Sequence, residues 1–280
     1  VTVSQPELEV IGVTNTTSNT DSYTGLEDGV SITQEISGNL DPTNVEVTLT
    51  GRSRQGGVTL WSSSTYESSV DVIYLGSTDE VIAVYDTDRV GRYNPSNGNL
   101  IATENVGQVR KMEPVDWKSE FVALGFDSFR VIDAVDFSTV YSKTGLTYPI
   151  NNGDTNQNDD TLVLALEEGS VAEYDLSDGT QLWLVSPSSG ENTRVAYGYS
   201  GDVFFGGYGE LLRIDGSTQN VEWSSSNDET GCQAIAVNES RGEVYTGFGT
   251  RIFVHDAEDG TQLNSYDTAS SSLRAGLYLD

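Results

Sequence analysis

The stretch from Val171 to Trp183, Val-Ala-Glu-Tyr-Asp-Leu-Ser-Asp-Gly-Thr-Gln-Leu-Trp, decides the fold because it recurs along the chain. Four other segments align with it: residues 90–102, 129–141, 211–223 and 252–264. The fifth positions of all five segments, 39 to 42 residues apart, are held by Asn94, Asp133, Asp175, Asp215 and Asp256. A period near 41 with several short strands in each unit is the signature of β-propeller blades.

Each unit divides into four apolar stretches, which predict four antiparallel strands. In the unit around Asp215 the first two are 195–197 and 203–205, and the third leads into the Asp. In the motif Asp-x-x-Asp-Gly, Asp accepts hydrogen bonds from backbone N–H groups two residues on, and Gly adopts a positive φ. We therefore expect these carboxylates to build turns rather than to catalyse a reaction.

The two ends of the chain predict a further, shared unit. Residues 273–280 resemble a first strand, and residues 49–61 fit the repeat with Ser53 in the Asp position. We predict an all-β propeller of six blades closed by both termini, with seven blades as the alternative. Residues 1–40 are expected to form an N-terminal β extension or attachment arm, with strand-like pieces at 8–13 and 30–36, and residues 41–280 the propeller.

The charge of the chain excludes two classes of partner. It has 280 residues, 43 Asp and Glu against 14 Lys and Arg, and a formal net charge of −29. Nucleic-acid backbones and anionic membranes both attract cationic surfaces, so we expect neither nucleic-acid binding nor membrane insertion. The acidic residues are spread along the chain and only three lysines are present, which resembles proteins of salt-in haloarchaea. An ordinary acidic secreted protein is the alternative.

The repeat resembles that of quinoprotein-like (PQQ-like, WD-type) propellers, written Asp-x-x-x-Gly-x-x-x-Trp and carried here by Asp175, Gly179 and Trp183. The resemblance covers residues 68–272, with departures such as Gln219 in place of Gly and Asn264 in place of Trp. Quinone-dependent members have eight blades, bound calcium and often paired cysteines, whereas this chain has one cysteine. Non-enzymatic relatives include surface scaffolds, assembly factors and adhesion modules. In haloarchaea, similar proteins are common in the cell envelope.

Residues suited to catalysis are scarce. The single histidine, His255, occupies a core-like strand position, and the single cysteine, Cys232, reads as a buried strand entry, so no nucleophile–base pair or zinc site is predicted. Carboxylates in the central channel of the propeller leave open a carbohydrate-active enzyme, either a hydrolase or a lyase.

Two sets of residues are candidates for ion binding. Asp154, Asn156, Asn158 and Asp160 alternate as oxygen donors, as in calcium loops, with a polar loop between blades as the alternative. Arg110, Arg194 and Arg274 fall near first strands and are candidates for anion binding in the channel, with pairing to nearby acids as the alternative.

From these patterns we expect a non-enzymatic interaction or structural module of a halophilic source. It would be displayed on a virion, as a spike, turret or fibre component, or on a cell envelope. It would bind a protein or a surface glycan through propeller loops. No cofactor is expected beyond Ca²⁺, Na⁺ or K⁺ as a structural ion.

Overall fold

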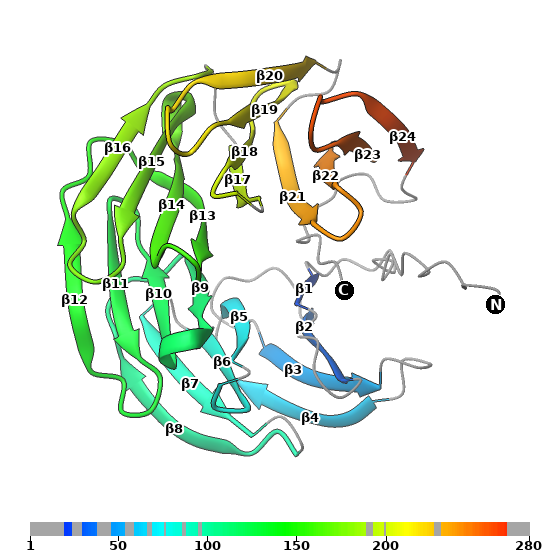
Figure 1. Ribbon diagram of the computed structural model, residues 1–280. Helices are drawn as coiled ribbons and strands as arrows, with labels where there is room; N and C mark the ends of the chain where they lie inside the picture. The colour runs from blue at the N-terminus through cyan, green and yellow to red at the C-terminus, as the bar shows by residue number, and fades with distance from the viewer. Residues whose placement is uncertain are drawn as a thin grey trace.

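A computed structural model describes residues 20–23, 30–37, 46–53, 59–65, 69–75, 77–85, 88–94, 97–188, 193–198, 200–226 and 231–267. The described strands form six four-stranded antiparallel sheets, and in each sheet strands that follow in sequence also lie side by side. We call them sheet 1 to sheet 6 in chain order. Figure 1 shows the sheets arranged around a common centre, with β9 and β13 inside and β12 and β16 at the periphery.

The strands have the following bounds. Sheet 1 holds β1 (Thr20–Tyr23), β2 (Val30–Ser37), β3 (Glu46–Ser53) and β4 (Thr59–Thr65). Sheet 2 holds β5 (Ser69–Leu75), β6 (Glu80–Tyr85), β7 (Arg89–Tyr93) and β8 (Leu100–Asn105). Sheet 3 holds β9 (Lys111–Val115), β10 (Glu120–Leu124), β11 (Ser128–Asp133) and β12 (Thr139–Thr144).

The second half of the chain continues the pattern. Sheet 4 holds β13 (Ile150–Asn156), β14 (Thr161–Leu166), β15 (Ser170–Asp175) and β16 (Gln181–Val185). Sheet 5 holds β17 (Arg194–Tyr197), β18 (Val203–Gly206), β19 (Glu210–Ile214) and β20 (Val221–Ser226). Sheet 6 holds β21 (Cys232–Asn238), β22 (Glu243–Phe248), β23 (Arg251–Asp256) and β24 (Gln262–Asp267). Two 3₁₀ turns, η1 (Asp116–Lys118) and η2 (Glu167–Gly169), complete the described elements.

The core lies between the faces of neighbouring sheets. The second strands of sheets 2 to 6 are mostly apolar, and every residue of β14 and β18 is buried. Such continuous apolar runs are expected of strands covered on both faces. The outermost strands, such as β8, are mostly exposed. Apolar clusters join sheet 2 to sheet 3 through Ile82 and Phe121, and sheet 3 to sheet 4 through Phe129 and Leu164.

The predicted turns are confirmed. The Asp175 side chain accepts hydrogen bonds from the Ser177 N–H and hydroxyl, and Asp133, Asp215 and Asp256 cap their turns in the same way. The bond from the Ser217 hydroxyl, with others from the Thr218 backbone and side chain, lowers the pKa of Asp215 to about 2. These carboxylates are therefore structural acceptors.

One β-bulge repeats at the same point of every hairpin that joins a third to a fourth strand. The register shifts between the two residues that precede each turn residue, as between Glu173 and Tyr174 before Asp175 in sheet 4. In sheet 1 the register shifts between Gly51 and Arg52. The backbone therefore places Ser53 at the position that Asp holds in the other units, as the weak sequence match predicted.

Neighbouring sheets also interlock through rings set against turns. A Cβ added to Gly179 would lie 2.9 Å from Cε2 of Tyr141, and one added to Gly260 would lie 2.5 Å from Cε3 of Trp223. Tyr141 and Trp223 belong to the fourth strand of the preceding sheet. The Trp223 indole N–H also donates to the Ala257 carbonyl, at 3.2 Å. Each ring thus fills the space left by a glycine in the next sheet.

Sheet 1 differs from the sequence expectation in its composition. Its four strands all come from residues 20–65, whereas we expected residues 273–280 to contribute a strand. β2 pairs with β3 over eight positions, from Val30 with Ser53 to Ser37 with Glu46, so the boundary predicted at residue 40 runs through this sheet. Strands adjacent in sequence pair most readily, and β1 and β2 carry no repeat signal that would assign them to this sheet. Residues 8–13 and 273–280 lie outside the described residues.

Candidate functional site

The first strands of sheets 2 to 6 line the centre of the fold side by side, and side chains tie each to the next. The Asp71 carboxylate of β5 accepts from the Met112 N–H of β9, at 2.6 Å. On β13, Asn152 and Asp154 accept from the N–H groups of Val195 and Tyr197 on β17, at 3.0 and 2.8 Å. An inner strand has an open edge, so these side chains satisfy N–H groups that the sheets leave unpaired.

A buried glutamate lies among these inner strands, close to a lysine whose side chain is one-third exposed. Lys111 Nζ and Glu113 Oε1 of β9 are 2.7 Å apart. Burial raises the pKa of Glu113 to about 8; Lys111 opposes the shift, and the charges of Asp154 and Asp71 add to it. Burial also raises the pKa of Asp154, against the hydrogen bonds donated by the Tyr197 and Thr155 N–H groups. The centre therefore holds a carboxyl that retains its proton near neutral pH.

Sequence reasoning missed Lys111 and Glu113. The available signal was the alternation Lys111-Met112-Glu113 within a first strand, which sends the two charged side chains to the same side. The charged side chains that act on Glu113 are the carboxylates of Asp154 and Asp71 and the ammonium group of Lys111. Within the described part of the chain, no three His, Cys, Asp or Glu side chains are grouped to hold a metal ion.

Three of the four predicted metal ligands have side chains hydrogen-bonded within the structure, and the fourth, Asn158, donates its backbone N–H to Asn156. Asp154 accepts from the Tyr197 N–H. Asn156 bonds to the Asp159 carboxylate and to the Asn158 N–H. Asp160, in the following turn, accepts from the Trp117 indole and forms an ion pair with Lys118 of η1. The segment is strand β13 and its hairpin to β14 within sheet 4, rather than the loop between blades named as the alternative, and metal binding by it stays a prediction.

Two of the three predicted arginines are described, and both reach backbone carbonyls of the next first strand. Arg110, just before β9, lies 3.5 Å from the Ile150 carbonyl that begins β13. Arg194, which begins β17, donates to the Gln233 carbonyl of β21 at 3.2 Å and is mostly buried, which lowers its pKa. β13 separates the two arginines in the ring, and the structure gives each a bridging role. Arg274 lies outside the described residues.

The lone histidine and cysteine are buried strand residues, as predicted. His255 lies in β23 stacked on Phe253, and burial lowers its pKa. Cys232 begins β21, is fully buried, and has its pKa raised to about 12 by that burial. A buried thiol that is held neutral is inert at physiological pH.

Two exposed aromatic side chains lie in loops at the same end of their sheets, which we call the entry end because each first strand begins there. The connection between β10 and β11 carries Phe126, which is 50 % exposed, and that between β18 and β19 carries Tyr208, which is 58 % exposed. The Arg110 guanidinium lies 5.4 Å from the centre of the Phe126 ring. Exposed aromatic and arginine side chains are the groups that protein interfaces favour.

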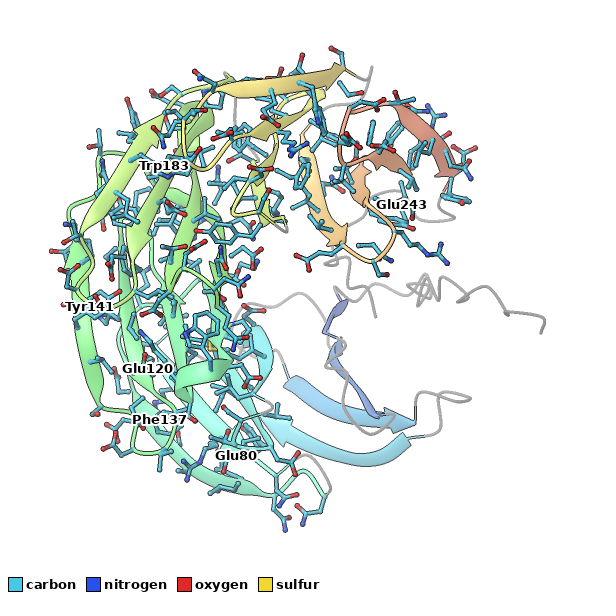
Figure 2. All side chains as sticks on the ribbon, viewed as in Figure 1. Glu80, Glu120, Phe137, Tyr141, Trp183 and Glu243 are labelled. Carbon is cyan, nitrogen blue, oxygen red and sulfur yellow. The ribbon has the colours of Figure 1, made fainter. Side chains whose placement is uncertain are left out.

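Backbone hydrogen bonds hold both connections in place. The Phe126 carbonyl accepts from the Ile150 N–H at 2.7 Å, and the Gly207 carbonyl accepts from the Cys232 N–H at 3.2 Å. In each case the donor begins the first strand of the following sheet. Phe126 and Tyr208 are thus presented on ordered, equivalent loops. Figure 2 shows the side chains on the same ribbon, with Tyr141 and Trp183 on outer strands.

Comparisons with known proteins agree on the architecture. A family model described as outer membrane protein assembly factor BamB matches residues 167–277. The crystal structure of BamB from Moraxella catarrhalis superposes with a TM-score of 0.66 at 16 % identity, covering 92 % of this chain and 79 % of that one. The chain has a β-propeller fold with PQQ-like repeats. The computationally designed protein Ika8 is similar too, with a TM-score of 0.71, 15 % identity, and coverage of 91 % and 77 %.

No curated protein matches the sequence. Among the described residues, no helix has the length and apolar character needed to cross a bilayer. The comparisons therefore bear on the fold alone.

Proposed function

We propose that this chain is a non-enzymatic binding module of a larger assembly, which engages a protein partner through the loops of the entry end. The observation that carries the proposal is the presentation of Phe126, Arg110 and Tyr208 on loops held by equivalent backbone hydrogen bonds. The description of the matched family as an assembly factor supports the same role. The opposite end supports it by contrast, because its carboxylates are occupied in capping turns.

The test is to replace both aromatic side chains in the tagged full chain and cross-link it in its native source. We expect Phe126→Ala with Tyr208→Ala to lose the cross-linked partner while keeping the melting temperature. Leu263→Ala is the matched control, because Leu263 is equally exposed, at 51 %, but lies on the outer strand β24. Partner retention by the double variant would refute the entry end as the binding surface.

We further propose that the six sheets close as a six-bladed propeller, with residues 273–280 completing the ring beside sheet 1. The bridging positions support this, because Arg110, Asn151, Arg194 and Gln233 begin successive first strands and Arg274 follows at the same spacing. Asn151 donates to the Thr193 hydroxyl, as the two arginines donate to carbonyls. Truncation after residue 267 is expected to lower the melting temperature sharply, and an unchanged value would exclude closure by this segment.

Display on a virion or cell envelope of a halophile, with a protein or a surface glycan as partner, remains part of this proposal. It rests on the even acidity and the scarcity of lysine. Quantitative proteomics of virions, envelope, medium and cytosol from the native source tests it. A fixed copy number in virions supports a structural or receptor-engaging component, enrichment in the envelope supports a cellular binding protein, and a cytosolic location refutes display.

The second candidate is a carbohydrate-active enzyme, favoured by one observation. Glu113 holds its proton near neutral pH beside Asp154, the pairing of acid and carboxylate that glycoside hydrolysis uses. Turnover of a glycan by the wild-type chain that is lost in Glu113→Gln and Asp154→Asn would establish it. Absence of turnover across a glycan panel would leave Glu113 with a structural role.

A further inference from the structure

Three loops of the entry end share one length and one position in their sheets. The connections from second to third strand in sheets 3, 4 and 5 each hold three residues: 125–127, 167–169 and 207–209. Figure 1 shows these sheets as neighbours around the centre. The middle residues of the three loops are Phe126, Glu168 and Tyr208, and all three are exposed. From sheet 3 to sheet 5 the entry end thus presents an aromatic ring, a carboxylate and a second aromatic ring, which we call the rim residues.

Backbone hydrogen bonds join the first of these loops to the second. The Phe126 carbonyl accepts from the Ile150 N–H at 2.7 Å, and the neighbouring Pro149 carbonyl accepts from the Glu167 N–H at 2.8 Å. Two consecutive residues, at the point where the chain enters β13, thus contact both loops. The loops that carry the first two rim residues are therefore held against the same piece of backbone.

Side chains join the second loop to the third. The connection from β16 to β17 carries Ser186, whose hydroxyl lies 2.8 Å from that of Ser170, the residue that follows the second loop. Two residues further on, the Ser188 hydroxyl donates to the carboxylate of Glu210, the residue that follows the third loop. One connection thus contacts both loops, and the rim residues belong to one continuous surface.

The carboxylates of these loops have no cationic partner within the described part of the chain. None of Asp127, Glu167 and Glu168 takes part in an ion pair there. Arg110 is already engaged, because it stacks on the Phe126 ring and reaches a backbone carbonyl. Glu168 also has a φ of +61°, a conformation that few residues other than glycine adopt. A fixed turn therefore presents an exposed carboxylate whose charge is uncompensated.

These observations deepen the binding function proposed above and rest on it. We propose that the entry end binds an extended basic segment of the partner protein, whose lysine or arginine pairs with Glu168 while flanking apolar side chains cover Phe126 and Tyr208. Packed sheets lie about 10 Å apart, so the two aromatic rings are separated by about 20 Å, which about six residues of extended chain span. Aromatic faces attract apolar groups and cations alike, so both rings suit such a segment.

Charge decides the chemistry of the segment. A purely apolar segment would bury the Glu168 carboxylate without a partner, which is costly. An acidic segment would be repelled by Glu168 and by the neighbouring Asp127 and Glu167. A basic segment satisfies the carboxylate, and the net charge of −29 draws it toward the chain.

Selection of random peptides of about seven residues on the immobilised full chain tests the proposal, at the lowest salt at which the chain stays folded. We expect the enriched peptides to carry lysine or arginine between apolar residues, and Glu168→Lys to weaken their binding by about tenfold. Glu168→Gln removes the charge with little change in size and is expected to show a smaller loss. Glu239→Lys is the matched control, because it makes the same charge change at an exposed glutamate between β21 and β22, at the opposite end.

Basic peptides that bind the wild type and Glu239→Lys equally, and that both Glu168 variants bind more weakly at unchanged melting temperature, support the proposal. Enrichment of peptides without basic residues, or no enrichment at all, overturns it. Equal weakening in Glu239→Lys also overturns it, because the attraction then comes from net charge alone.

Failure of the proposed function gives a different result. In that case Phe126→Ala with Tyr208→Ala retains the partner cross-linked in the native source. Loss of that partner in the double variant but not in Glu168→Lys would keep the entry end as the binding surface and overturn the basic segment.

Discussion

Trp223 in β20 lies so close to Gly260 of the next sheet that a Cβ on residue 260 would meet its Cε3 atom at 2.5 Å. Gly260 also has a φ of +74°, which L side chains adopt only with strain. The indole and the turn thus require glycine for two independent reasons. The contact joins the fourth strand of sheet 5 to the third hairpin of sheet 6, so it bears on how neighbouring sheets are held together.

We predict that Gly260→Ala destabilises the chain more than Gly145→Ala. Gly145 has a similar φ of +72° but no atom within 4 Å of its Cβ position. The control therefore carries only the backbone strain, about 1–2 kcal/mol, whereas Gly260→Ala adds overpacking of about 1–3 kcal/mol. Denaturant unfolding of both variants in molar salt measures the difference. Equal losses would mean that Trp223 moves aside without cost.

The contact between sheets 2 and 3 fills the same space with a large side chain in the turn and a small one in the fourth strand. Residue 137 holds the position of Gly179 and Gly260, with a φ of +60°, but it is a buried phenylalanine. The fourth strand of sheet 2 has Ala102 where sheets 3 and 5 have Tyr141 and Trp223, and Ala102 packs against the cluster that contains Phe137. The Phe137 ring also meets Phe121 edge to face at 6.4 Å. The large side chain has moved from the strand to the turn.

Substitution by glycine is therefore expected to change the free energy of unfolding in opposite directions at two turns. Phe137→Gly removes a buried ring, a loss of about 3–5 kcal/mol that relief of backbone strain offsets only in part. Gln219→Gly relieves the same φ of +60° at a partly exposed site and is expected to stabilise by up to about 1 kcal/mol. Thermal unfolding compares the two variants, and a stabilised Phe137→Gly would contradict the packing argument.

The repeat itself could be read from sequence because turn chemistry is local. Asp175, Ser177 and Gly179 specify one hairpin within five residues, and the structure confirms the capping bonds. Phe137 and Ala102 could not be paired in advance, since each looks like a departure from the repeat until the two are seen in contact. Compensation between sheets depends on packing that no single unit encodes.

The candidate site was harder to predict from the sequence, because it too depends on packing between sheets. Glu113 is one of 43 acidic residues, and the alternation Lys111-Met112-Glu113 is a weak signal for its position. Its pKa rises only because the inner strands of several sheets surround it with buried surface and with Asp154 and Asp71. Asp154, predicted as a metal ligand, has oxygens that accept backbone N–H groups of β17 and of Thr155, and the spacing along the chain did not predict these bonds. Both outcomes follow from contacts between sheets rather than from spacing along the chain.

The buried Glu113 predicts a pH dependence of stability. A carboxyl whose pKa is about 8 in the folded chain and 4.5 as a free group binds more protons when folded. The free energy of unfolding is therefore expected to fall as pH rises from about 4.5 to about 8. Glu113→Gln removes this contribution, so the variant should lose less stability than the wild type across that range.

The comparison must be made as a difference, because burial also raises the pKa of Asp154 and Glu173. Those groups act in the same direction and remain in both proteins. Urea unfolding at several pH values between 4.5 and 8.5, at fixed ionic strength, gives the two curves. Parallel curves would show that Glu113 ionises in the folded chain as it does in the unfolded one.

The last prediction concerns salt. A net charge of −29 destabilises the compact state through self-repulsion. The screening length falls from about 10 Å at 0.1 M to about 3 Å at 1 M salt, so most of that repulsion disappears over this range. The melting temperature is expected to rise steeply from low to molar KCl. Sucrose at matched osmolality stabilises by exclusion from the surface but does not screen charge, and it is the control. A rise in sucrose as large as that in KCl would show that the acidity does not set the salt requirement, and it would remove the argument for a halophilic source.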